Sequence, residues 1–185
     1  YRVHDGIKVF NPAGQFEREV GAQDYAYGDN VTTNTPYGLA IDGQDRIFVA
    51  DFEANTVRVF NSEGRQIARF FGEQGSQPGQ FYGSGHLAVD DQRDLLYVSD
   101  ESNSRVQQFA LTETANGGLE ATFRLTFGSY GREPGQLAYP QDVAVDETNG
   151  RVYVADMANR RIQAFDSEGQ YLLEFSPPDD WQVIG

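Results

Sequence analysis

Apolar and polar residues alternate along this chain in short runs, and the same order of runs occurs three times. Apolar runs at residues 47–51, 96–100 and 152–156 each end in an aspartate, and an alternating segment that ends in phenylalanine follows each of them. Every copy also begins with a shorter apolar run that ends in aspartate. Runs of this length, bounded by polar and glycine-containing turns, predict β-strands and leave no long amphipathic helix.

The spacing of the repeated aspartates predicts how these strands are grouped. Asp51, Asp100 and Asp156 lie 49 and 56 residues apart (100 minus 51 and 156 minus 100). A period of roughly 50 residues in a β-rich chain is typical of propellers, whose blades are sheets of four short strands. We therefore predict an all-β propeller of four-stranded antiparallel blades, with hairpins joining the strands of each blade.

Two connectors between the repeats, residues 71–81 and 127–137, carry glycines and proline at identical spacing. With the Val-Ala-Asp strands, they make the chain resemble the NHL repeat in three full copies from Thr35 to Phe175. The resemblance implies an NHL-type β-propeller, most often six-bladed, in a family that includes binding platforms, lyases and lactone hydrolases. The second copy departs from the pattern at 84–85, where it has Ser-Gly and the other copies have Pro-Tyr or Pro-Gln.

The repeats divide the chain into parts of one propeller domain. These are the outer half of a first blade with a loop (1–34), three blades (35–84, 85–139 and 140–176), and the start of a next blade or a tail (177–185). Aligning Phe10 with Phe60 sets Tyr1 opposite Asp51, inside a blade. We therefore expect the chain to be an incomplete part of a larger propeller.

The charge and composition limit the classes of partner. The net charge of −14 disfavours nucleic acid, whose binding depends on clustered lysine and arginine. The acidic charge either keeps the β-surface soluble or attracts a cation or a basic partner. The chain has no cysteine, which excludes disulfides and thiolate metal sites, and no run approaches the roughly 20 apolar residues of a transmembrane segment. By analogy with similar propellers, we expect an extracytoplasmic location, whether periplasmic, secreted or at the cell surface.

The repeated polar residues have a structural interpretation. One aspartate occurs at the same place in each blade, where a strand enters its turn and a carboxylate can accept backbone N–H bonds. Asparagines follow three residues after two of these aspartates. We predict structural repeat turns at Asp51, Asp100, Asp156, Asn103 and Asn159, and no catalytic residue among them.

Two residues are candidates for a ligand site at the mouth of the central channel. His86 and Asp142 align with Gly38 at the start of the innermost strand of each blade, where strands from all blades converge. The resemblance to family lyases that hold zinc with channel histidines makes zinc an alternative here. The oxygen-rich loop with Asp90, Asp91 and Asp94 makes calcium a second alternative, with solvated turn acids as the favoured interpretation of that loop. A catalytic zinc needs three protein ligands, which this segment alone does not supply, so we predict no cofactor.

Two functions remain open. In the first, the chain is a non-enzymatic protein-binding or scaffolding module, contacting a protein partner or larger assembly through loops such as 22–34 and 112–119. Its candidate contact residues are the tyrosines Tyr25, Tyr27, Tyr82 and Tyr130. In the alternative, the chain is part of a metal-dependent lyase or lactonase with its site at the channel mouth. Because the repeated polar residues already have structural roles, we favour the first.

Overall fold

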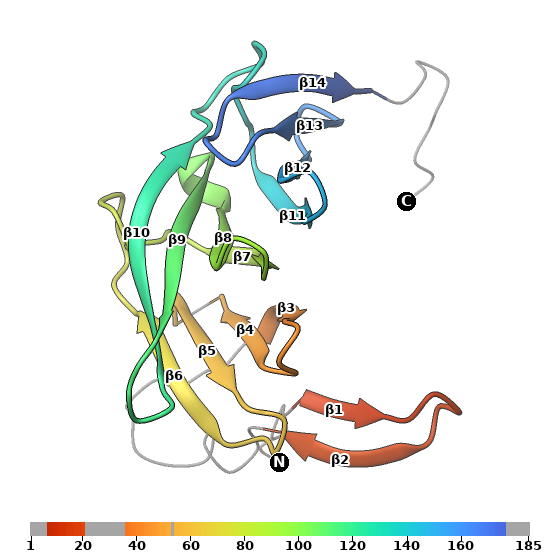
Figure 1. Ribbon diagram of the computed structural model, residues 1–185. Helices are drawn as coiled ribbons and strands as arrows, with labels where there is room; N and C mark the ends of the chain where they lie inside the picture. The colour runs from red at the N-terminus through yellow and green to blue at the C-terminus, as the bar shows by residue number, and fades with distance from the viewer. Residues whose placement is uncertain (1–6, 21–35, 53, 177–185) are drawn as a thin grey trace, which may run out of the picture.

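The computed structural model describes residues 7–20, 36–52 and 54–176 of the chain. Over these residues the strands form three four-stranded antiparallel sheets and one two-stranded sheet, which fan around a common centre (Figure 1). The predicted all-β propeller of four-stranded antiparallel blades is confirmed. None of the helical structure in the described ranges is long and apolar enough to cross a membrane.

The strands follow one another in simple order within each sheet, from the innermost to the outermost. The two-stranded sheet contains β1 (Ile7–Phe10) and β2 (Phe16–Val20). The next sheet contains β3 (Pro36–Ile41), β4 (Ile47–Asp51), β5 (Thr56–Phe60) and β6 (Gln66–Phe71). The third contains β7 (Ser84–Asp90), β8 (Leu95–Asp100), β9 (Arg105–Glu113) and β10 (Leu119–Phe127). The fourth contains β11 (Pro140–Asp146), β12 (Arg151–Asp156), β13 (Arg161–Phe165) and β14 (Tyr171–Phe175).

The apolar core lies between neighbouring sheets. One cluster joins the β3–β6 and β7–β10 sheets around Phe48, Phe81 and Phe109, and another joins the β7–β10 and β11–β14 sheets around Tyr97 and Phe165. Large aromatic side chains fill this space because the sheets twist relative to one another. The packing of blade against blade therefore provides most of the buried apolar surface.

The third strand of each blade also buries its polar side chains. The alternation in the sequence places apolar and polar residues on opposite faces, yet Gln107, Gln108 and Gln163 are completely buried and Arg58 is 4% exposed. The preceding connectors cover Gln107 and Gln163, and a turn of the following blade covers Gln108. Buried polar groups need hydrogen-bond partners, and backbone carbonyls accept from the Nε2 group of each of these glutamines, while the buried Oε1 of Gln108 has no partner among the described residues.

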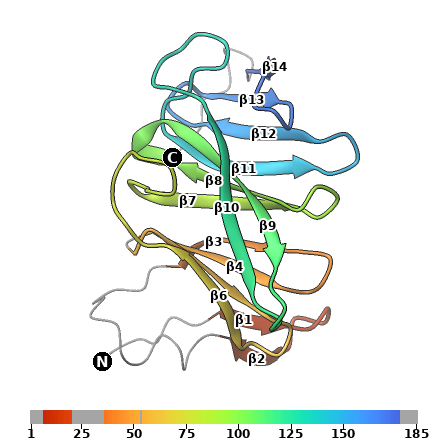
Figure 2. The same ribbon diagram turned by 60° about the vertical axis from the view of Figure 1, so that its left-hand side comes forward.

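The β9–β10 hairpin is longer than the hairpins of the other blades and reaches over the β3–β6 sheet (Figure 2). Leu111 and Leu119 are buried in the same cluster as Ile67 of β6, and Arg46 Nη1 lies 3.0 Å from Glu113 Oε1. The 112–119 segment, expected to be a contact loop, is thus partly used to fasten one blade to the next. The other expected contact loop, 22–34, lies outside the described residues.

Candidate functional site

One end of the propeller gathers the connectors and the loops that follow the second strands. We call it the connector face. It is formed by the connectors together with the residues that follow them (72–83 and 128–139) and by the loop residues 52, 54–55, 101–104 and 157–160. Backbone bonds join these loops to the connectors: Ser102 N donates to Tyr82 O (3.3 Å) and Ala158 N donates to Ala138 O (3.1 Å). The innermost strands β3, β7 and β11 also start at this face, so the channel mouth opens here.

Asp100 is the centre of a buried hydrogen-bond cluster on this face. Its carboxylate is fully buried and accepts bonds from Tyr82 N (2.9 Å), Asn103 Nδ2 (2.9 Å), Arg105 Nε (2.8 Å) and Gln107 Nε2 (3.3 Å). The same three side chains then donate to backbone carbonyls of the preceding connector, at Gly75, Ser76, Gln77 and Gln80. The cluster therefore holds the connector against the blade.

Asp156 forms the same cluster in the next blade. Its carboxylate accepts from Ala138 N (2.7 Å), Asn159 Nδ2 (2.8 Å), Arg161 Nε (2.8 Å) and Gln163 Nε2 (3.2 Å). These side chains donate to connector carbonyls at Gly131, Glu133 and Gln136. The two aspartates thus bond the connector as well as their own turn, whereas the sequence predicted only the turn.

The first described blade uses a different set of residues. Asp51 is fully buried and accepts from Ala54 N (3.2 Å), but Thr56 and Arg58 stand where the later blades have arginine and glutamine. Asn55 Oδ1 accepts from Gly83 N (3.1 Å) and so contacts the following connector. The hydrogen-bond clusters around Asp100 and Asp156, which we call the fastening clusters, therefore occur in two of the three described four-stranded blades.

The structure brings the two channel-mouth candidates together. His86 Nδ1 lies 3.0 Å from Asp142 Oδ1, and the ring of Tyr37 meets the His86 ring edge-on with centroids 5.2 Å apart. The three residues come from three different blades. The His86 and Asp142 side chains are partly exposed, at 34% and 58%. They form a polar bridge across the start of the innermost strands.

Ser99 explains the departure of the second repeat from the family pattern. Its hydroxyl accepts from His86 N (2.9 Å) and can donate to His86 O (3.2 Å) or Gln141 O (3.3 Å) in the next blade. A Cβ atom at Gly85 would lie only 2.6 Å from Ser99 Oγ. Because the other blades have alanine in place of Ser99, they have room for Tyr37 and Gln141 in place of Gly85.

A metal site does not form at this mouth from the described residues alone. Across the described ranges, no group of three histidine, aspartate or glutamate side chains lies close enough to hold an ion. Glu101 lies near His86, and burial raises the pKa of its carboxyl above the usual value of 4.5, while the charge of His86 partly offsets the rise. Zinc or calcium at this site remains the alternative of the sequence analysis.

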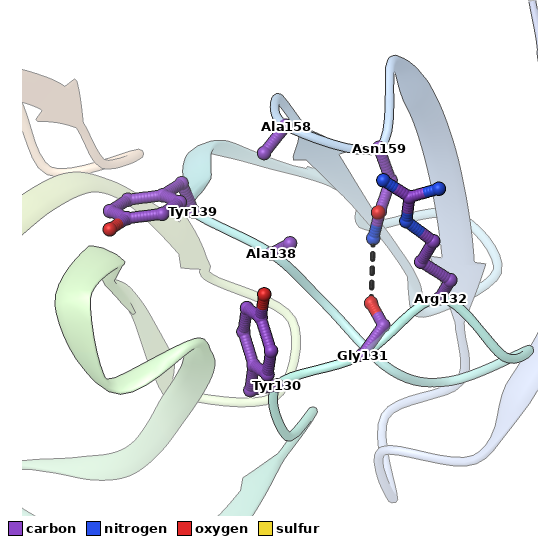
Figure 3. A pocket seen from close by; sticks show the side chains of 7 residues that line it. All are labelled: Tyr130, Gly131, Arg132, Ala138, Tyr139, Ala158 and Asn159. Carbon is purple, nitrogen blue, oxygen red and sulfur yellow. Dashed lines mark hydrogen bonds between the residues drawn. The ribbon is translucent and has the colours of Figure 1, made fainter.

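Two hollows lie at the same repeat position on the connector face. The larger, of about 320 Å³, is lined by Tyr130, Gly131, Arg132, Ala138, Tyr139, Ala158 and Asn159 (Figure 3). The other, of about 270 Å³, is lined by Phe52, Asn55, Gln74, Tyr82, Gly83 and Ser102. The equivalence follows from the sequence, because Gln74, Tyr82, Gly83 and Ser102 each lie 56 residues before a residue of the larger hollow.

Exposed aromatic residues flank both hollows. Tyr130 is 77% exposed, Tyr82 53% and Tyr139 50%. Tyr82 and Tyr130 were candidates from the sequence, whereas Tyr139 was missed because the aligned residue of the other connector is Gly83. Met157, also missed, is 52% exposed on the neighbouring loop. The candidates Tyr25 and Tyr27 lie outside the described residues.

The radial sheets and the converging inner strands define this chain as a β-propeller protein. It carries NHL repeats, since the family model for the NHL repeat matches residues 33–60 and 137–165, and the predicted resemblance is confirmed.

Curated relatives of two kinds are similar to the chain. Over 106 residues it is 34% identical to Protein brain tumor of Drosophila melanogaster, a match that covers 57% of this chain and 9% of that protein. Over 149 residues it is 26% identical to the probable peptidyl-alpha-hydroxyglycine alpha-amidating lyase pgal-1 of Caenorhabditis elegans, covering 77% of this chain and 41% of that protein. The chain thus spans less than half of either relative.

Solved structures share the fold. A streptogramin B lyase superposes with a TM-score of 0.61 at 13% identity, over 96% of this chain and 49% of that one. A luciferin-regenerating enzyme superposes with a TM-score of 0.64 at 13% identity, over 94% of this chain and 57% of that one. At such low identity the likeness establishes the propeller architecture alone.

Proposed function

We propose that this chain is a non-enzymatic NHL-repeat propeller module that binds a protein partner, or a larger assembly, through its connector face. The observation that carries the proposal is the exposure of Tyr82, Tyr130 and Tyr139 beside two hollows of the same face. Tyrosines supply large, rigid contact area with a polar tip and are enriched at protein interfaces.

The use of the repeated polar residues supports the same proposal. Asp100 and Asp156, with the side chains bonded to them, are occupied in fastening connectors to blades. What this face presents to solvent therefore includes three exposed tyrosines among polar and charged side chains such as Gln74 and Arg132. The net charge of −14 argues further for a protein partner over nucleic acid.

Photo-crosslinking tests the proposal. With p-benzoylphenylalanine in place of Tyr130, we expect one defined protein from the native source to be crosslinked. The additional substitution Tyr139→Ala should reduce that product strongly. The same photoreactive residue at Phe16, which is 57% exposed on β2, is the control. A crosslinking pattern equal to that of the control would contradict the proposal.

A second candidate function rests on the His86–Asp142 pair. His86 Nδ1 and Asp142 Oδ1 lie 3.0 Å apart at the channel mouth. This geometry favours the second function, and so does the similarity of the chain to a relative named as a probable amidating lyase. In this function the pair would contribute to a metal-dependent site. Stoichiometric zinc or calcium after dialysis of the intact protein, lost in His86→Ala, would support it, whereas absence of retained metal would count against it.

We also propose an extracytoplasmic location for the protein, in the periplasm, in secretion or at the cell surface. Its support is the analogy with acidic, cysteine-free propellers of this type. Fractionation of the native source with an antibody to the chain tests it, and recovery in the cytoplasmic fraction would contradict it.

A further inference from the structure

The larger hollow has an unusual set of polar groups. Part of its backbone is bonded within the protein: Gly131 N donates to Leu137 O (3.2 Å), and Gly131 O accepts from Asn159 Nδ2 (2.8 Å), as the dashed line in Figure 3 shows. Ala138 N donates to the Asp156 carboxylate. The side-chain polar groups of the lining that these bonds do not occupy are the Arg132 guanidinium, the hydroxyls of Tyr130 and Tyr139, and the amide oxygen of Asn159.

Arg132 differs from the arginines nearest to it in the fastening clusters. Arg105 and Arg161 are largely buried and each is held 2.8 Å from an aspartate oxygen. Arg132 is exposed, and within the described part of the chain its guanidinium makes no ion pair, although Glu133 is its neighbour in sequence. Figure 3 shows it on the wall of the hollow opposite the two tyrosine rings. A cation is thus available to a ligand in the hollow.

The Arg132 guanidinium and the two tyrosine hydroxyls favour a ligand whose polar part accepts hydrogen bonds. A guanidinium has five N–H donors and no acceptor, and tyrosine hydroxyls can donate as well. A carboxylate matches the planar fork of arginine with two parallel hydrogen bonds. The tyrosine rings and the alanines Ala138 and Ala158 offer apolar surface to the carbons that carry the carboxylate. A volume of about 320 Å³ accommodates a side chain of that size.

Charge decides which kind of carboxylate ligand is favoured. The chain has 28 acidic and 14 basic residues, so a strongly anionic partner would be repelled by the molecule as a whole. A single carboxylate in an otherwise neutral or basic segment avoids that repulsion. The second hollow is consistent with this, because it lacks a charged lining residue and Ser76 occupies the repeat position of Arg132.

We infer that the connector face binds a protein segment that inserts one aspartate or glutamate side chain into the hollow lined by Tyr130, Arg132 and Tyr139. The flanking residues of the segment are neutral or basic, and a neutral side chain occupies the hollow beside Tyr82. This inference rests on the proposed protein-binding function and names the chemistry of the partner.

Selection from a random peptide display library tests the inference with defined probes. We expect the peptides selected on the protein to share one acidic position within a segment that is not otherwise acidic. Replacing that position by its amide, or making Arg132→Gln, should weaken binding about 10- to 100-fold, as for a lost charge-assisted hydrogen bond. Arg132→Lys should restore only part of the affinity, because lysine lacks the fork. Arg151→Gln, an exposed arginine at the start of β12, is the matched control and should bind normally.

The outcomes separate this inference from the proposed function. Two results would overturn the insertion of an acidic side chain while leaving the connector face as the binding surface. In the first, peptides depend on Tyr130 and Tyr139 but share no acidic position. In the second, they bind the Arg132→Gln variant as well as the wild type. Peptides unaffected by Tyr130→Ala and Tyr139→Ala would overturn both. Failure to select any peptide would likewise count against both. Selected peptides whose affinity is lost with either amide replacement or Arg132→Gln would support both.

Discussion

At the scale of single residues, Asp100 and Asp156 act as shared acceptors. Each buried carboxylate receives a backbone N–H from a connector and side-chain N–H groups from an asparagine, an arginine and a glutamine. Since a carboxylate has lone pairs for about four donors, these clusters use its full capacity. A change at the acceptor therefore disturbs every donor around it.

Asp100→Asn is expected to lower the free energy of unfolding by about 3–5 kcal/mol, because the Arg105 charge would lose its buried partner. Urea denaturation measures this difference. Asp94→Asn is the matched control, since Asp94 is exposed and its φ of 51° is tolerated by asparagine. Equal effects of the two substitutions would show that the Asp100 cluster does not stabilise the fold.

Glu101 gives the stability a dependence on pH. Because burial raises the pKa of its carboxyl above 4.5, the folded protein binds this proton more tightly than the unfolded chain does. The stabilisation that this proton contributes to the folded protein is fully present below about pH 4.5 and is lost as the pH rises through the raised pKa of Glu101. Glu101→Gln should therefore gain stability relative to the wild type between about pH 4 and pH 7. Urea midpoints across this range test it, with the exposed Glu120→Gln as control. A difference that is constant with pH would contradict the expectation.

At the scale of elements, the β9–β10 hairpin links blades that are otherwise joined through the core and one connector. Its extension carries Leu111 and Leu119 onto β6 of the preceding blade. A hairpin used in this way covers the outermost strand of its neighbour and shields part of that strand's edge from other chains.

Leu119→Ala is expected to destabilise the protein by about 2–5 kcal/mol, because it removes buried apolar volume between the hairpin and β6. It should also speed amide hydrogen exchange in residues 66–71. Leu172→Ala is the matched control, since Leu172 is 43% exposed and its truncation should change stability by only about 0.5 kcal/mol. A Leu119 variant as stable as the control would show that the hairpin does not fasten the blades.

The sequence predicted the blades because each strand pattern is present three times and hairpins join neighbours in sequence. The hydrogen bonds between connector and loop were not predicted, since Arg105 and Gln80 are 25 residues apart and nothing local marks them as partners. The hollow beside Arg132 was missed for the same reason, because three separate segments form it. His86 and Asp142 could be paired in advance only because repeat alignment put both at strand starts.

At the scale of the whole molecule, the excess of acidic residues acts on the fold as well as on partners. A net charge of −14 on 185 residues places many like charges on one surface. Their mutual repulsion opposes the compact state, and salt screens it because the Debye length falls from about 30 Å at 0.01 M to about 8 Å at 0.15 M.

The melting temperature should therefore rise when sodium chloride is increased from about 0.01 M to about 0.15 M. Differential scanning calorimetry measures the change, and potassium chloride at equal concentration should give the same rise because screening depends on ionic strength. A fall in the melting temperature would mean that salt weakens favourable ion pairs, such as Arg46 with Glu113, more than it relieves repulsion.

The fastening clusters also bear on how such a chain can lengthen. Every bond that Asp100, Asn103, Arg105 and Gln107 make to a connector reaches back to residues 75–82, within the same repeat period. A duplication of the coding segment for residues 72–127 would therefore copy donors and acceptors together. The new blade would arrive with the hydrogen bonds that attach its own connector, so tandem duplication would add a blade whose connector is already fastened.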